Sequence, residues 1–281
     1  MPRADKSCKQ VPYSLQLIMN NMTCLQINTR HSRTASAALA QLIIENNYDV
    51  VCVQEPYASL TYSDQTQQPY VRISNIPPGY QCFHNLNNDH AYGALIFARS
   101  SLKARNRTEL SSNNISAIQF KVNSSSITIF SVYLRPTDKN PENSLHNLCS
   151  ILKNDSKTSI FCIDSNAKNR LWGSTVSNAK GLSLEAAISS NNLHLLNRKL
   201  PECPITPIGT SFIDITLAGD NKNSNFWAYL DLPSLSDHPY IAFNFSLSDS
   251  STLNTRPRHQ VPTIQRINTE LFRHFYHQSR H

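Results

Sequence analysis

A carboxylate and an amide follow a short apolar run near the middle of the chain. The run is Ile-Phe-Cys-Ile at residues 160–163, and Asp164 and Asn166 come directly after it. An apolar run of this length is typical of a strand that is buried on both faces. A strand that ends on a carboxylate places that charge at the rim of a sheet, where active sites are commonly built. Because one carboxylate cannot act alone, a functional site here requires polar groups from other strands at the same rim.

Polar side chains also accompany the ends of other expected strands. They are Asn28, Glu55, Tyr133, Asp214, Asp237 and His238. Carboxylate and amide oxygens are ligands that hard cations such as Mg²⁺ prefer, and imidazole gains or loses a proton near neutral pH. Taken singly, each side chain could equally serve the local fold, since an Asp after a strand is usually a turn former. Asp214 is expected in the interior of a strand, where an unpaired charge would be costly, so we expect it to have a partner.

Strands predominate among the elements that must position these side chains. Apolar patterns predict strands at residues 22–29, 50–53, 92–98, 115–122, 127–133, 160–163, 193–196, 212–217, 226–230 and 240–245. Apolar stripes with helical spacing predict helices at residues 35–47, 141–152 and 182–190, and a final helix is expected at 268–277. The polar, proline-bearing segment 61–88 is expected to be a long surface excursion. Strands with interspersed helices indicate an α/β protein with mixed sheets.

The composition indicates a globular protein that associates with an anionic partner. Of the 281 residues, 40% are hydrophobic and 16% are charged, and the formal net charge is +7. A positive balance of this size favours association with a polyanion. The seven cysteines include no Cys-x-x-Cys pair, which argues against a zinc module and for a reducing compartment.

Several function classes are disfavoured by motifs that the sequence lacks. Six glycines form neither a Gly-x-Gly-x-x-Gly fingerprint nor a P-loop, which removes dinucleotide and P-loop nucleotide binding as leading hypotheses. No segment reaches the ~20 apolar residues of a membrane span, and residues 1–21 lack the apolar core of a signal peptide. We therefore expect no membrane partner and an intracellular protein.

In their order along the chain, the polar strand ends resemble those of the endonuclease/exonuclease/phosphatase superfamily, whose fold is DNase I-like. The resemblance covers about residues 22–245 and is carried by Gln54-Glu55-Pro56, Asp164-Ser165-Asn166 and Ser236-Asp237-His238. A narrower resemblance, to endonuclease domains of arthropod non-LTR (LINE-like, jockey-type) retrotransposons, is carried by Leu25-Gln26-Ile27-Asn28, Gln54-Glu55-Pro56-Tyr57, Asp164-Ser165-Asn166-Ala167, Leu171-Trp172-Gly173-Ser174 and Ser211-Phe212-Ile213-Asp214. The resemblance implies a four-layer α/β/β/α sandwich, in which two mixed sheets pack face to face between outer helices.

The resemblance also implies a metal-dependent phosphodiesterase and a set of metal ligands. Glu55 would be the first ligand of Mg²⁺, for which Mn²⁺ could substitute, and Asn28 and Asp237 would assist. The sequence departs from the superfamily at Ile163, where a Gly often stands. It departs again at Arg30, where DNA-repair members carry an acidic ligand two residues after the asparagine. Metal binding is therefore expected to rest mainly on Glu55, with a single ion.

The same resemblance implies how the remaining residues act on a phosphodiester. Asp164 would orient the attacking water or take its proton, and Asn166 would fix the geometry of Asp164. His238 would stabilise the charge that develops on the phosphate, and Asp214 would hold and charge the imidazole. Tyr133 would contact the scissile phosphate.

The narrower resemblance implies a DNA endonuclease that nicks double-stranded target DNA in the nucleus and leaves a 3′-hydroxyl primer. A reverse transcriptase domain and element RNA would be its partners. The expected DNA-phosphate contacts are Arg30, Arg135, Lys168 and Arg170. The catalytic domain is expected at residues 22–247, between a leader (1–21) and a basic linker (248–281). Two alternatives remain open: a phosphatase or phosphodiesterase of this fold for phospholipid or inositol phosphate, and an inactive DNA-binding remnant.

Overall fold

Two six-stranded mixed sheets make up most of the described chain. The computed structural model describes residues 21–87, 93–122, 125–136, 141–155, 158–197, 212–219, 224 and 226–246. All of these lie within residues 1–248, one of the two units into which the chain divides. The expected leader, apart from Asn21, and the expected linker with its final helix lie outside the described residues.

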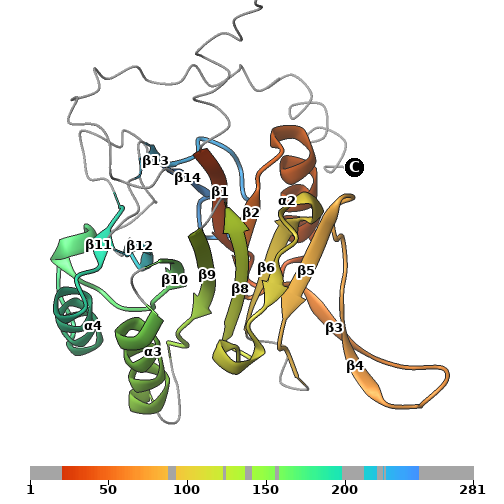
Figure 1. Ribbon diagram of the computed structural model, residues 1–281, viewed down its shortest axis with the longest axis horizontal. Coiled ribbons are helices and arrows are strands. Elements are labelled where there is room, and N and C mark those ends of the chain that lie inside the picture. Colours follow the sequence, from red (N-terminus) through yellow and green to blue (C-terminus); the bar gives the residue numbers. More distant parts are fainter. Residues whose placement is uncertain are drawn as a thin grey trace, which may run out of the picture. The chain divides into compact units, whose positions relative to one another are not determined.

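The first sheet has the strand order β13-β14-β1-β2-β6-β5 (Figure 1). Its strands are β1 (Asn21–Asn28), β2 (Val50–Gln54), β5 (Tyr80–His84), β6 (Ala94–Arg99), β13 (Trp227–Tyr229) and β14 (Ile241–Ser246). β1 and β2 run parallel, and the other neighbouring strands run antiparallel. The parallel pair β1 and β2 therefore delivers the residues after both strands to one rim.

The second sheet has the strand order β11-β12-β10-β9-β8-β7. Its strands are β7 (Arg105–Asn106), β8 (Ile115–Val122), β9 (Ser125–Tyr133), β10 (Ser159–Asp164), β11 (His194–Leu195) and β12 (Asp214–Ala218). Here β9 and β10 form the parallel pair. A separate hairpin, β3 (Ala58–Tyr62) and β4 (Pro69–Ile73), extends from the first sheet (Figure 1).

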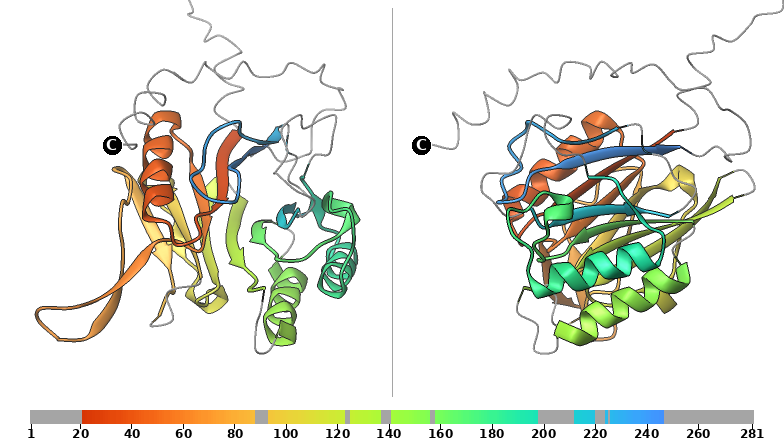
Figure 2. Two further views of the ribbon diagram at one scale, coloured as in Figure 1. Left: turned by 180° about the vertical axis from the view of Figure 1, so that it is seen from behind. Right: turned by 90° about the vertical axis from the view of Figure 1, so that its left-hand side faces the viewer.

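Helices cover the outer faces of the two sheets. α2 (Arg33–Asn46) packs on the first sheet, and α3 (Pro141–Asp155) and α4 (Ala179–Ser190) lie together against the second (Figure 2). The described residues also form the short 3₁₀ helices η1 (Ser100–Leu102), η2 (Thr108–Leu110) and η3 (Arg170–Trp172). Within the described part of the chain, no helix combines the length and hydrophobicity that a bilayer crossing requires. The expected four-layer α/β/β/α sandwich is confirmed.

Three apolar clusters follow from the two-residue period of the strands. In β1, Cys24 faces the second sheet while Leu25 faces α2; in β10, Cys162 faces the first sheet while Phe161 faces α3 and α4. Successive strand side chains point to opposite faces, so each sheet buries both of its faces. This explains why the central strands are almost continuously apolar.

The helices α2 and α4 begin at polar caps that lie earlier than the apolar stripes indicated, whereas α3 begins at Pro141 as expected. Ser32 accepts a hydrogen bond from the Ala35 N–H and starts α2, and Asn178 accepts one from Gly181 and starts α4. A Cβ at Gly181 would lie 2.0 Å from the carbonyl oxygen of Lys168. The glycine therefore permits the close approach of α4 to the loop after β10.

Two sequence expectations were wrong. Segment 61–88 is not one surface excursion, because it contains the end of β3, all of β4 and the edge strand β5. No position of these three strands is fully buried, so they lack the apolar run of a core strand, and this masked the strand pattern. Asp214 does not lie in a strand interior but is the first residue of β12, because Phe212 and Ile213 bond to the loop after β10 instead.

Buried polar groups join the two sheets close to the rim. The Nε2 of Gln54 in β2 donates to the Ser131 hydroxyl at 3.0 Å and to the Cys162 carbonyl at 3.2 Å. The Ser131 hydroxyl in turn donates to the Val53 carbonyl at 3.2 Å. Gln54 and Ser131 have no exposed surface, so each bond is protected from water.

We expect Gln54→Ala to lower the free energy of unfolding by about 2–3 kcal/mol, because it leaves buried partners in the second sheet without a donor. Urea denaturation measures the change. Gln81→Ala, at an exposed position of β5, is the matched control and should change stability by less than about 0.5 kcal/mol. Equal losses in the two variants would contradict the proposed link between the sheets.

Candidate active site

The two-residue period carries polar side chains from both sheets onto the face between them. Asn28 continues the row that begins with Cys24 in β1, and Asp164 continues the row of Ile160 and Cys162 in β10. The Cα atoms of Tyr133 and Asp214 pair directly with that of Asp164 in the neighbouring strands. Where the apolar core ends, polar residues occupy the next positions of the same rows. The structure therefore brings these side chains together at one rim, as the sequence predicted.

Asn28 connects the carboxylates of the two sheets. Its Nδ2 donates to Glu55 Oε2 at 2.9 Å and to Asp164 Oδ2 at 2.7 Å, and its Oδ1 accepts from the Arg30 N–H at 2.7 Å. Because the backbone N–H of Arg30 requires an acceptor, the amide oxygen faces Arg30 and the NH₂ group faces the carboxylates. In this orientation Asn28 acts as a donor to carboxylates, and its expected part as a metal ligand remains a prediction.

Glu55 is held where it leaves β2. Its backbone has a φ of 45°, and its N–H donates to the Gly93 carbonyl at 2.9 Å. The hydroxyl of Tyr133, from the opposite sheet, donates to Glu55 Oε1 at 2.8 Å, and His31 Nε2 lies 3.4 Å from the same oxygen. A Cβ at Gly93 would lie 2.5 Å from the Asn113 carbonyl oxygen, so glycine permits this close packing beside Glu55.

Several loops at this rim contain left-handed residues other than glycine. They are Arg30, His31, Glu55, Asn166 and Leu235, with φ between 44° and 56°. Each such residue costs about 1–2 kcal/mol and persists only where the surroundings hold it. Strained backbone that clusters at one rim is typical of a functional site.

His238 and Asp214 form the second half of the site. His238 Nδ1 lies 2.7 Å from Asp214 Oδ2, and both side chains are largely buried. The loop that carries His238 is anchored to β1, since the Ser236 hydroxyl donates to the Asn28 carbonyl at 2.8 Å. The Ser234 hydroxyl donates to the His238 carbonyl at 2.6 Å. The expected pairing of Asp214 with the imidazole is present.

The buried charges shift each other's pKa. Burial raises the pKa of the Asp164 carboxyl to about 7, and the negative charge of Asp214 adds to the rise against the opposing effect of His238. Burial alone would lower the pKa of His238, but the charge and hydrogen bond of Asp214, together with the charge of Asp164, raise it to about 10. His238 is therefore an imidazolium at neutral pH, placed to stabilise negative charge.

Oxygen atoms dominate the groups that could hold a cation here. Ligand atoms of Asp164, Asp214 and His238 lie within 4.8 Å of one another. Because His238 Nδ1 is engaged by Asp214 Oδ2 at 2.7 Å, we assign that cluster to charge and proton handling. Oδ1 of Asp214 is buried and has no hydrogen-bond partner among the described atoms. Glu55, with carboxylate oxygens from other strands nearby, fits a hard cation such as Mg²⁺ or Mn²⁺.

The remaining predicted residues lie at the edge of this network. Asp237 and Arg30 form an exposed ion pair of 2.8 Å, so neither lies in the buried part of the site. Asn166 directs its backbone N–H to Asp164 Oδ1 at 3.2 Å, as expected, but its amide group donates to the Leu134 carbonyl at 3.1 Å. The loop after β10 carries Lys168 and Arg170, and Arg135 follows Leu134; DNA contacts by these residues remain predictions.

The sequence did not single out every residue that shapes the site. His31 lies beside Glu55, and Lys180 in α4 donates to the Leu134 and Arg135 carbonyls at 3.3 and 3.2 Å. The only sequence signal for His31 at the site was its place three residues after Asn28. The sequence held no such signal for Lys180, because its position depends on how α4 packs. Trp172, which belongs to one of the motifs of the narrower resemblance, is buried and donates from Nε1 to the Ala167 carbonyl at 3.1 Å.

We expect the imidazole of His238 in the EDTA-treated protein to titrate near pH 10, and Asp214→Asn to lower its pKa by several units. Because the folded-state pKa is raised, the pair stabilises the fold fully below about pH 6.5 and loses this contribution as pH rises toward 10. NMR titration of the histidine ring protons tests this, with His194, exposed in β11, as the internal control. A His238 pKa near that of His194 would contradict it.

Residues 127–242 match the family model described as Endonuclease-reverse transcriptase. No curated protein sequence matches the chain. Solved structures of similar fold include the endonuclease domain of TRAS1, a telomere-specific non-LTR retrotransposon. That domain has 23% identity and a TM-score of 0.66, over 80% of this chain and 98% of that one.

Two other solved structures differ in the activity that their names state. The AP endonuclease LMAP from Leishmania major has 14% identity and a TM-score of 0.59, over 82% of this chain and 89% of that one. The mannosyl-6-phosphatase Bt3783 of Bacteroides thetaiotaomicron has 13% identity and a TM-score of 0.53, over 80% of this chain and 99% of that one. The solved structures show that the chain has the DNase I-like fold, and the segment 127–242 matches the endonuclease-reverse transcriptase family model.

Proposed function

We propose that the chain is a metal-dependent DNA endonuclease that nicks target DNA and leaves a 3′-hydroxyl from which a reverse transcriptase can prime. One observation carries the proposal: Asn28 bridges Glu55 to Asp164, and Asp164 lies beside the pair of Asp214 and His238. A diester at this rim would meet a cation site, a carboxylate base and a fixed positive charge together. The similarity to the retrotransposon endonuclease domain and the net charge of +7 support DNA as the substrate.

Glu55 would hold a divalent cation, with Asp237 as the next candidate ligand on the neighbouring loop. Bound there, the cation supplies neutralising charge to the phosphate oxygens. Tyr133 and Asn28 each donate to the Glu55 carboxylate, at 2.8 and 2.9 Å, and so fix its orientation toward a ligand. Asp237 would first have to leave Arg30, to which it is bound at 2.8 Å.

The protein residues have separate parts in hydrolysis. Asp164 accepts a proton from the attacking water, whose oxygen forms the new bond to phosphorus. The bond from phosphorus to O3′ breaks, and the leaving oxygen takes up a proton to give a 3′-hydroxyl beside a 5′-phosphate. The imidazolium of His238 stabilises the added negative charge, and Asp214 keeps it protonated and oriented.

We expect Asp164→Asn and His238→Ala each to reduce nicking of supercoiled plasmid by about 10²-fold or more, because each removes a group that acts on the reacting atoms. Excess EDTA should abolish the nicking of the unaltered protein. Lys121→Ala, at an exposed site toward the opposite end of β8, should retain activity. Nicking that persists in either variant or in EDTA would refute the proposal.

The principal rival is a phosphatase or phosphodiesterase of the same fold that acts on phospholipid or inositol phosphate. Release of inorganic phosphate from such substrates, without any plasmid nicking, would favour it. Salt-sensitive DNA binding without either activity would instead indicate an inactive remnant.

A further inference from the structure

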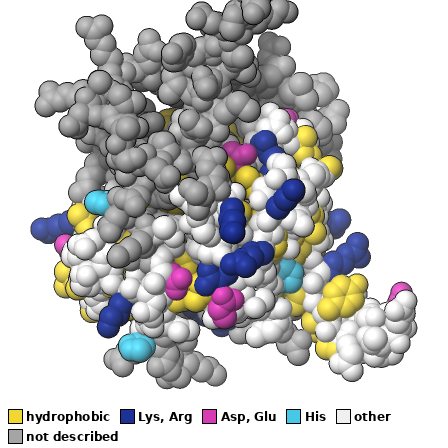
Figure 3. Space-filling view, viewed as in Figure 1, with side chains coloured by type: hydrophobic (Ala, Val, Ile, Leu, Met, Phe, Trp, Pro, Cys, Tyr) yellow, Lys and Arg dark blue, Asp and Glu magenta, His cyan; other side chains and the backbone are white. Residues whose placement is uncertain are grey.

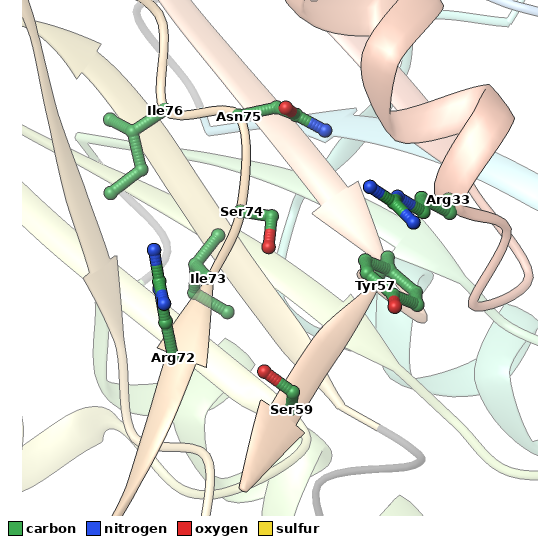
Figure 4. A pocket seen from close by; sticks show the side chains of 8 residues that line it. All are labelled: Arg33, Tyr57, Ser59, Arg72, Ile73, Ser74, Asn75 and Ile76. Carbon is green, nitrogen blue, oxygen red and sulfur yellow. The ribbon is translucent and has the colours of Figure 1, made fainter. Parts of the chain in front are cut away.

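An open pocket of about 590 Å³ lies beside the active-site rim, at the base of the β3–β4 hairpin (Figure 4). Arg33 from the start of α2 and Tyr57 before β3 line one side, and Arg72 of β4 lines another, with the Ser59 and Ser74 hydroxyls between them (Figure 4). None of the residues that line it is acidic. The pocket thus combines two guanidinium groups with an aromatic ring and small hydroxyls.

Arg33 and Arg72 differ from the other arginines of the described chain. Arg99 and Arg107 are paired with carboxylates, as is Arg30 at the rim. The face shown in Figure 3 illustrates this usual arrangement, since Lys and Arg side chains near its middle lie beside Asp and Glu. Among the described residues, neither Arg33 nor Arg72 has a hydrogen-bond or ion-pair partner for its side chain, and both are exposed. Two unneutralised cations that line one hollow suit an anionic ligand.

The pocket is continuous with the rim through two short segments. The ring of His31 bonds to the Pro56 carbonyl at 3.2 Å, and the His31 N–H donates to the Glu55 carbonyl at 2.8 Å. Arg33 follows His31 by two residues, and Tyr57 follows Glu55 by two. Two residues span at most about 7 Å. Arg33 and Tyr57 therefore join the backbone within about 7 Å of His31 and Glu55, next to the rim.

We propose that this pocket binds the backbone of the DNA strand beside the cut, with Arg33 and Arg72 on a phosphate and the ring of Tyr57 against the adjoining sugar or base. The inference rests on the proposed function, because it takes DNA as the substrate. Guanidinium groups match phosphate oxygens in geometry as well as in charge, and aromatic rings accept any base or sugar face. The pocket would position the strand without reading its sequence.

Salt-dependent binding tests the pocket separately from catalysis. A fluorescein-labelled 20-base-pair duplex is titrated with protein in EDTA at several salt concentrations, and binding is followed by anisotropy. We expect Arg33→Ala and Arg72→Ala each to weaken binding by about 3- to 10-fold and to reduce the slope of log K against log salt by about 0.9. The double variant should reduce the slope by about 1.8. Lys121→Ala removes an exposed cation of β8 that does not line the pocket, and it should leave the slope unchanged.

The outcomes separate this proposal from the nuclease assignment. Slopes that match the unaltered protein in all three arginine variants, or no DNA binding by the unaltered protein, would overturn the pocket proposal. A reduced slope in a protein that never nicks DNA would support the pocket and overturn the nuclease function. If nicking occurs, we also expect Arg72→Ala to raise KM for plasmid with little change in kcat, since Arg72 does not touch the reacting atoms.

Discussion

The site depends on two short hydrogen bonds from one amide nitrogen. Asn28 Nδ2 lies 2.9 Å from a Glu55 oxygen and 2.7 Å from an Asp164 oxygen, and these two carboxylates belong to different sheets. Two buried negative charges repel, so a donor between them stabilises both. The amide can face the carboxylates only because its oxygen is engaged by the Arg30 N–H at 2.7 Å. The left-handed turn after β1 is therefore part of the same arrangement.

The sandwich fold holds the two sheets in fixed positions, so that Asn28 from one sheet lies within hydrogen-bond distance of Asp164 from the other. Gln54 bonds across the interface to Ser131 and Cys162, one or two residues before the strands reach Glu55, Tyr133 and Asp164. The inward row of β1 turns polar at Gln26 and Asn28, that of β10 turns polar at Asp164, and Asn28 meets Asp164 across the interface at 2.7 Å. The packing that stabilises the fold therefore also sets the spacing of the reactive groups. A change of register by one residue in either sheet would turn its polar residue away from the interface.

The sequence alone predicted the parts that rest on local pattern. Buried strands with polar ends placed Asn28, Glu55 and Asp164 at one rim, because alternation and strand direction are local properties. It did not predict β5 or the β3–β4 hairpin, whose exposed residues make the segment look like loop. The sequence also did not predict that the Asn28 amide faces the carboxylates as a donor, since this orientation depends on the backbone N–H of Arg30. Nor did it predict the hydrogen bond from Lys180 to the Leu134 carbonyl, which depends on how α4 packs. Contacts between elements distant in the chain set these features.

The most direct test of the central claim is a double-mutant comparison of nicking rates for Glu55→Gln, Asp164→Asn and the variant with both changes. If Asn28 joins the two carboxylates into one functional unit, the double variant should lose about as much activity as the worse single variant. Losses that multiply, so that the double variant falls by the product of the two single effects, would show that the carboxylates act independently. That result would contradict a functional coupling through Asn28.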